Sequence, residues 1–261
     1  SDGPVVVVNV SQWRCDAIII RPDGVEPVPL PFTFAEAEDR LQRHLRVLAA
    51  FEDSADAARA AAARRDADGQ DLTLVRAAQR AANVQMEMTL QLDRDLDELL
   101  AWLWDAVVEP VLGRLPDIPA QGPLPRVWWC PTGPLGMLPI HAAGRGQDWL
   151  MDRVVSSYTP TLRSLLHARR PRQRAADRQL LIASALAGGL GDDTDLLARL
   201  ERTKVTVLHP QNATVSAVSD ALTVSDWVHF HCHADQHLSN PAMGAIQLTD
   251  GQLRVFDIAA L

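Results

Sequence analysis

The residues best able to do chemistry lie close together in the run WVHFHCHADQH, residues 227–237. This run contains one cysteine and four histidines: Cys232, His229, His231, His233 and His237. Imidazole nitrogens can ligate a divalent metal ion, and a histidine can also serve as the general base for a cysteine thiol. The run therefore raises two hypotheses, a metal site and the base of a cysteine-dependent hydrolase.

The alternation of the run is that of a β-strand, in which successive side chains point to opposite faces. We expect one face to carry His229, His231 and His233, and the other to carry Val228, Phe230 and Cys232. Histidines on one face could bind zinc, and the pattern comes near the H-x-H-x-D-H of binuclear zinc hydrolases. One residue too many separates Asp235 from His237, however, and the other histidines show no paired spacing that would complete a ligand set. A zinc-dependent hydrolase with His229, His231 and His233 as ligands is therefore the third of our hypotheses.

His233 differs from the two histidines before it, because the strand is expected to end there, where the polar segment ADQHLSNP begins. In open α/β sheets, ligands and catalytic groups gather at the carboxyl ends of strands. A histidine at that place can act as the base for a cysteine presented by the end of the next strand, since a thiolate paired with imidazolium is reactive near neutral pH. His229 and His231 are more simply explained as packed or hydrogen-bonded histidines.

Composition restricts the class of protein. The 261 residues are 47% hydrophobic and carry a net charge of −8, and no basic run is interleaved with aromatic residues as a nucleic-acid groove requires. The longest apolar windows are far shorter than the roughly 20 residues of a membrane span. Three cysteines without a signal-peptide pattern indicate a reducing compartment rather than a disulfide framework. We therefore expect a soluble cytoplasmic protein that binds neither nucleic acid nor membrane.

The chain changes character twice. β-branched runs at residues 5–10 and 15–20, the second followed by an Asp23-Gly24 turn, predict strands within residues 1–32. From residue 33 to 115 the pattern is helical, with Thr33 as N-cap and Glu36 three residues later, and it is interrupted only near residues 64–71. After a Pro-rich link, short apolar runs alternate with helical segments through residues 116–261. This alternation favours an α/β fold with a mainly parallel sheet, and the preceding region is then a helical insertion.

The last 35 residues, WVHFHCHADQHLSNPAMGAIQLTDGQLRVFDIAAL, resemble the CHAT domain, a caspase-like module related to the separase and caspase peptidases. Three other stretches resemble landmarks of this family in the same order: GPVVVVNVSQWRCDAIII, RVWWCPTGPLGMLPIHAAG and VVSSYTPTLRSLL. The resemblance implies a caspase-like three-layer α/β/α sandwich and a cysteine peptidase that uses a His/Cys dyad without a cofactor. It also implies a protein or peptide substrate, and an association with tetratricopeptide repeats or another sensor domain of the same parent protein.

Within this resemblance the catalytic histidine is His233, and the backbone N–H of Ala234 is the candidate donor of the oxyanion hole. His231 and Ala234 stand where the family usually has a small residue and a glycine. The family's nucleophile ends a later strand, so the resemblance implies a cysteine beyond Leu261 and a chain that holds only the base half of the dyad.

None of the chain's own cysteines, Cys15, Cys130 and Cys232, matches the nucleophile's position. The chain is then either a fragment of an active peptidase or a non-catalytic signalling or scaffold module of the same family.

Two further places receive structural interpretations. We expect His141, in the run LPIHAAG, to be a buried histidine that bonds to the backbone. We expect Ser156 and Ser157 to cap the helix after Pro160, with the lining of a substrate groove as the alternative.

Overall fold

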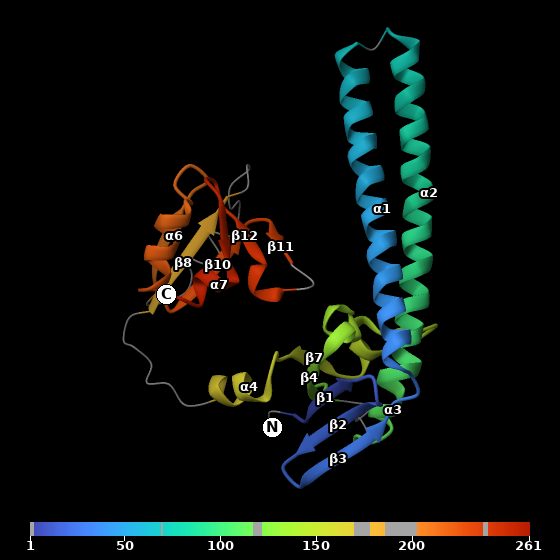
Figure 1. Cartoon of the computed structure of the whole chain (residues 1–261), viewed down its shortest axis with the longest axis vertical. Coiled ribbons are helices and arrows are strands. Elements are labelled where there is room, and N and C mark those ends of the chain that lie inside the picture. The colour runs from blue at the N-terminus through green and yellow to red at the C-terminus, as the bar shows by residue number, and fades with distance from the viewer. Residues whose placement is uncertain (1–2, 69, 117–121, 170–177, 186–202, 237–239) are drawn as a thin grey trace. The chain divides into compact units, whose positions relative to one another are not determined.

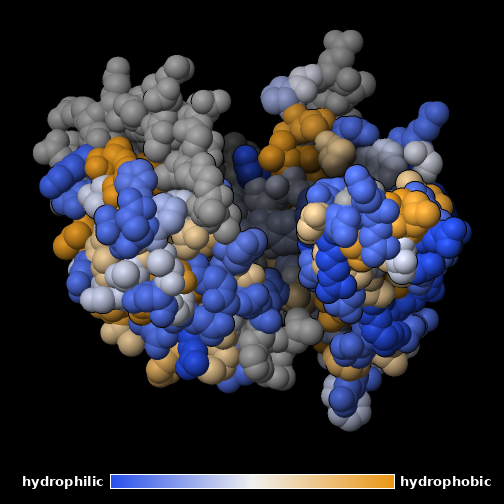
Figure 2. All heavy atoms as spheres, turned by 90° about the horizontal axis from the view of Figure 1, so that it is seen from above, coloured by the Kyte–Doolittle hydropathy of each residue, from blue (hydrophilic) through white to orange (hydrophobic). Residues whose placement is uncertain are grey.

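The computed structural model describes residues 3–68, 70–116, 122–169, 178–185, 203–236 and 240–261 (Figure 1). The chain divides into two compact units, Ser1–Arg170 and Pro171–Leu261, which we call unit 1 and unit 2. No helix among the described residues is both long and apolar enough to span a bilayer. The surface in Figure 2 is mainly hydrophilic, with separate hydrophobic groups between the polar ones.

Unit 1 contains a five-stranded sheet with the strand order β3-β2-β1-β4-β7. The strands are β1 (Val5–Val10), β2 (Cys15–Arg21), β3 (Gly24–Pro29), β4 (Arg126–Pro131) and β7 (Val155–Tyr158). The parallel strands are β1, β4 and β7, whereas β2 is antiparallel to both β1 and β3. The β-branched residues of β1 and β2 favour pleated strands, and the hairpin predicted at Asp23-Gly24 is present.

A long helical hairpin follows the opening strands of unit 1. Its helices are α1 (Phe34–Ala67) and α2 (Leu72–Leu103), which continues through a π-helical turn (Trp104–Val108) into α3 (Glu109–Leu112). The predicted cap is confirmed, since Thr33 Oγ1 accepts from Glu36 N and a Glu36 carboxylate oxygen accepts from Thr33 N at 2.7 Å. The predicted interruption near residues 64–71 contains the turn between the two helices.

The base of this hairpin packs on the sheet, and its outer part extends away from it (Figure 1). The shared core includes Val8, Ile19 and Trp129 from the strands and Leu99 and Leu103 from α2. The two helices also bond directly to each other, since Arg43 Nε donates to the buried carboxylate of Asp95 at 2.9 Å. Unit 1 therefore rests on one hydrophobic core at the base of the hairpin.

Short elements join the later strands of unit 1. They are three 3₁₀ turns (Gly133–Met137, Ile140–Ala142 and Leu150–Asp152), the ribbon of β5 (Gly144–Arg145) and β6 (Asp148–Trp149), and α4 (Leu162–Ala168).

The described residues of unit 2 form two small sheets. The first is parallel, with the order β10-β8-β9, and consists of β8 (Arg178–Ser184), β9 (Thr203–Leu208) and β10 (Trp227–His231). The second is antiparallel and consists of β11 (Ala234–Asp235), β12 (Ala245–Gln247) and β13 (Gln252–Arg254). Among the described residues of this unit, the helices are α6 (Val215–Leu222) and α7 (Val255–Ile258), with a 3₁₀ turn at Pro241–Met243. Leu181, Ala183, Val218, Leu248 and Leu253 form the buried centre of this unit.

The chain is thus a mixed α/β protein, as the sequence predicted. Its described strands lie in several sheets, and the largest contains both parallel and antiparallel pairs. The largest sheet differs from the mainly parallel sheet that was expected, because the strands β2 and β3 add antiparallel pairs to the parallel strands β1, β4 and β7. The segments 1–32, 33–115 and 116–261 remain a prediction as domains.

Candidate functional site

The histidine run occupies the carboxyl end of β10 and the turn that follows it. β10 pairs with β8 from Trp227 opposite Leu180 to His231 opposite Ser184. The predicted alternation is present within the strand, since Val228 and Phe230 pack against the core of unit 2 while His229 is exposed. The strand ends at His231, so His233 lies just beyond its carboxyl end.

His231 bonds to a serine that no motif in the sequence marks. Its Nδ1 lies 3.1 Å from the hydroxyl oxygen of Ser184, which ends β8 and is fully buried. A buried hydroxyl needs a hydrogen-bond partner, and the facing histidine provides one. The only sequence signal for this pair is that a polar residue ends the apolar run LLIAS. His231 is therefore a hydrogen-bonded histidine at a strand end.

His233 has an exposed side chain, and in the described part of the chain its ring has no hydrogen-bond or ion-pair partner. Its backbone is held, because its carbonyl accepts from Gln247 N at 2.8 Å. The next residue, Ala234, pairs with Ile246 in the antiparallel ladder of β11 and β12. The imidazole of His233 is therefore accessible on a backbone that a small sheet holds in place.

The backbone N–H of Ala234 is not used by that ladder. A bond from Gln247 N to the carbonyl of His233 is the pattern that flanks a non-hydrogen-bonded pair of facing residues, here Ala234 and Ile246. In such a pair the N–H groups point away from the neighbouring strand. This donor lies directly after His233 and is directed away from β12.

Each of the three cysteines donates its thiol to a backbone carbonyl. The sulfur of Cys232 is 3.3 Å from the oxygen of Ala183, that of Cys130 is 3.7 Å from Pro160 and that of Cys15 is 3.9 Å from Ser11. Burial raises the pKa of all three thiols. Cys232 follows His231 directly, is partly buried and packs against the core of unit 2. None of the three thiols has the lowered pKa of an activated nucleophile.

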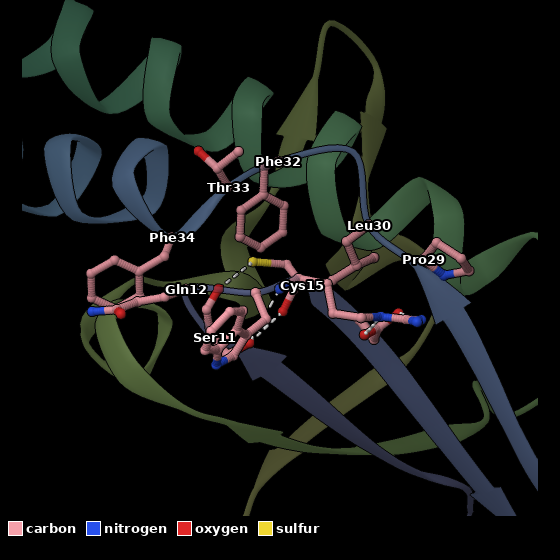
Figure 3. Close-up of a pocket in the computed structure, with 11 residues that line it drawn as sticks. Ser11, Gln12, Cys15, Pro29, Leu30, Phe32, Thr33 and Phe34 are labelled. Carbon is pink, nitrogen blue, oxygen red and sulfur yellow. Dashed lines mark hydrogen bonds and ion pairs between the residues drawn. The ribbon is translucent and has the colours of Figure 1, made fainter.

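Cys15 also lines a pocket of about 450 Å³ in unit 1 (Figure 3). Its walls come from the β1–β2 turn and from the segment that leads into α1, with Phe32 above the thiol, Ser11 below it, and Phe34 and Gln12 to one side in Figure 3. All the lining residues lie between Ser11 and Phe34, so the pocket holds none of the candidate histidines.

The metal hypothesis gains no support from the described residues, among which no three His, Cys, Asp or Glu side chains are grouped so that they could hold an ion. His229 is exposed and His231 bonds to Ser184. The fourth histidine of the run, His237, lies outside the described residues.

Two structural expectations in unit 1 are wrong. His141 is exposed rather than buried, and its Nδ1 lies 3.0 Å from the hydroxyl of Tyr158, because the 3₁₀ turn that carries it lies beside the end of β7.

The helix after Pro160 is capped by Thr161, whose side chain accepts from Ser164 N at 3.0 Å. Ser156 and Ser157 lie in β7 and cap nothing. Ser156 accepts from the indole N–H of Trp129, and Ser157 accepts from Arg126.

A comparison with protein families finds one match, the CHAT domain, which covers residues 97–261. The match includes the histidine run and two of the other three landmark stretches, and it starts after the stretch at residues 3–20. It covers more than half of the chain. No curated protein matches the sequence significantly.

Proposed function

Because the chain belongs to the CHAT domain family, we propose that the carboxyl end of β10 is the base half of a caspase-like cysteine peptidase site. His233 is the general base, and the N–H of Ala234 is a donor of the oxyanion hole. The observation that carries this proposal is the position of the two groups: an accessible imidazole at the end of a parallel strand, followed by a backbone N–H that the adjoining ladder leaves free.

The nucleophile in this proposal comes from chain outside these 261 residues. In the described part of unit 2, β10 pairs with β8 on one side and with no strand on the other. A strand that added in parallel to this free edge would lie about 4.8 Å from β10, with its carboxyl end beside His233. A cysteine at that end could give its proton to the imidazole and attack a peptide carbonyl as the thiolate. The developing oxyanion would accept the hydrogen bond from Ala234.

The surroundings implied by the family belong to the same proposal. The substrate is a protein or peptide, and no cofactor takes part. The parallel sheet of unit 2 is part of a three-layer sandwich that the added strand extends. The domain works in the cytoplasm, together with tetratricopeptide repeats or another sensor domain of the parent protein.

A non-catalytic signalling or scaffold module is the second candidate. It is favoured by the cysteines, since all three thiols donate to backbone carbonyls and burial raises their pKa. On this alternative, the strand that adds to β10 carries no cysteine at its end, and unit 2 binds a partner without cleaving it.

The test uses the longer polypeptide that includes the strand after Leu261, and it measures labelling by a peptidyl electrophile that reacts with active-site thiols. We expect His233→Ala to lower the labelling rate at least about 100-fold, the usual contribution of a general base. His229→Ala is the matched control, because His229 is exposed on the same strand and points away from the core, and it should label at the parent rate.

Undiminished labelling of His233→Ala would show that another group is the base. An unlabelled parent protein, with intact masses that establish that the added strand is present, would favour the non-catalytic module. Circular dichroism of both variants ensures that a lost rate is not a lost fold.

A further inference from the structure

The outer face of α2 carries an exposed apolar stripe that nothing in the described chain covers. Its members are spaced three, four or seven residues apart and therefore share one face of the helix: Leu72, Val75, Ala82, Met86 and Leu90. Leu72, Met86 and Leu90 are more than half exposed. The hairpin from Phe34 to Leu96 also precedes the residues that the family match covers, so the family's chemistry does not account for the stripe.

The stripe is separate from the face of α2 that packs against α1. That inner face carries the buried Ala78, Gln85, whose side chain accepts from Ser54 of α1, and Asp95, which binds Arg43 of α1. The outermost hairpin residues that reach the core of unit 1 are Leu45 and Leu96. Between Leu72 and Leu90, therefore, α2 is supported by α1 on one side and presents apolar side chains on another.

The stripe is complementary to itself when two copies run antiparallel. A twofold axis near residue 81 sets Leu72 opposite Leu90, Val75 opposite Met86, and Gln79 opposite Ala82. Large apolar side chains then meet each other at both ends, and the amide lies beside the small side chain in the middle. The side chains of the stripe are thus arranged symmetrically about residue 81. A twofold contact between two identical helices needs a surface that is complementary to itself in this way.

The charges of α2 have the same symmetry. Arg76 and Arg80 are the only charged residues from Leu72 to Asn83, whereas the following turns are mainly acidic, beginning with Glu87. Among the described residues, Arg76, Arg80 and Glu87 have no ion-pair partner. Arg76 and Arg80 are also four residues apart, a spacing at which like charges destabilise an isolated helix. The antiparallel register brings Arg76 alongside the partner's Glu87.

We propose that this face of α2 is a homodimer interface, in which two copies of the chain pair through antiparallel α2 helices centred near residue 81. A contact made by one helix of each copy is smaller than the roughly 1,200–2,000 Å² buried in a typical stable interface. The dimer is therefore expected to form with a dissociation constant in the range of about 1–100 µM. High salt should weaken it, because the Arg76–Glu87 pairs lie at its exposed edge.

Sedimentation velocity of the whole 261-residue chain over this concentration range tests the proposal. The parent chain should shift from 28.6 kDa to twice that mass as its concentration rises. Met86→Glu should raise the dissociation constant at least about tenfold, because it brings an unpaired carboxylate into the interface twice per dimer. Val84→Glu is the matched control, since Val84 is 49% exposed and Met86 61%, and Val84 lies on another face of the same helix. This control should dimerise like the parent.

Charge reversal gives a second and independent readout. Arg76→Glu and Glu87→Arg should each weaken the dimer roughly threefold to tenfold, because each removes two exposed ion pairs and sets like charges together. The double variant, R76E with E87R, should restore the parent dissociation constant, because the pair is rebuilt with its signs exchanged.

Three outcomes would overturn the proposal. The first is a chain that stays monomeric at about 100 µM, the weakest affinity expected. The second is a dimer that Met86→Glu and Val84→Glu weaken equally, which would mean that another surface mediates it. The third is a double charge variant that is no better than the single ones.

Discussion

At the scale of single residues, the bond between Ser184 and His231 distinguishes two histidines that the sequence places side by side. Ser184 is fully buried, and the ring of His231 lies 3.1 Å from its hydroxyl. Replacing either partner would leave a polar group without its hydrogen bond, which typically costs about 1–3 kcal/mol. His231 is thus engaged in holding two strand ends together, whereas His233 is exposed and available.

The cysteines provide a prediction at the same scale. Because burial raises the pKa of Cys15, Cys130 and Cys232, each thiol stays protonated to a higher pH in the folded chain than in the unfolded one. We expect alkylation by iodoacetamide, followed by mass spectrometry, to be slower at pH 8 in the native chain than in urea. Only the thiolate reacts, so the alkylation rate levels off once the thiol is fully deprotonated. In the native chain this rate should still rise with pH at values where the rate in urea is already constant.

The raised pKa values of the thiols also determine how the stability of the fold changes with pH. A raised thiol pKa contributes stability that is complete below the unfolded pKa and is lost as the pH rises through the folded value. Rapid labelling of native Cys232 at pH 7 would contradict the prediction, because it would indicate a lowered pKa instead.

At the scale of elements, the helix caps and turns follow local chemistry closely. The capping box of Thr33 and Glu36 begins α1 where the sequence predicts. The polar run TDGQ, residues 249–252, likewise contains the turn between β12 and β13. The last described helix begins at Val255, two residues before the acidic side chain of Asp257. The reason is that Asp257 occupies the third helical position and its carboxylate accepts from Arg254 N at 3.1 Å.

The cap of α1 can be tested directly. Thr33→Ala should lower the free energy of unfolding by about 1 kcal/mol, because it removes the oxygen that satisfies the N–H of Glu36. Thr33→Ser is the control, since it keeps that oxygen and should retain most of the stability. Urea denaturation measures both variants, and equal losses would show that the hydroxyl is not the stabilising group.

At the scale of the whole molecule, the described residues of each unit form hydrophobic clusters of their own. Leu103 is fully buried in the core of unit 1, and Leu181 is fully buried in that of unit 2. Each unit therefore has its own source of stability, and the long hairpin belongs to the first.

We expect thermal unfolding to contain two transitions. Leu103→Ala should lower the transition of unit 1 and Leu181→Ala that of unit 2, each by an amount equivalent to about 2–5 kcal/mol for a cavity in a packed core. Differential scanning calorimetry of the two variants makes the comparison. A single transition that both variants shift equally would mean that the units unfold as one.

The sequence by itself determined the features that depend on neighbours along the chain. The period of side chains predicted the hairpin helices, and the alternation in the histidine run predicted which residues of β10 face the core. The polar segment that follows the run predicted a strand end at His233, and the strand ends two residues earlier, at His231. Each of these depends on residues a few positions apart, so a local pattern is sufficient.

Only the tertiary structure decided which strands are neighbours and which polar groups meet. β4 pairs with β1 although the whole hairpin separates them in sequence, and Ser184 meets His231 across two strands. The free N–H of Ala234 likewise depends on its register with Ile246. Many strands have the same apolar alternation, so the partner of each is selected by the packing of the complete core, which no short stretch of sequence contains.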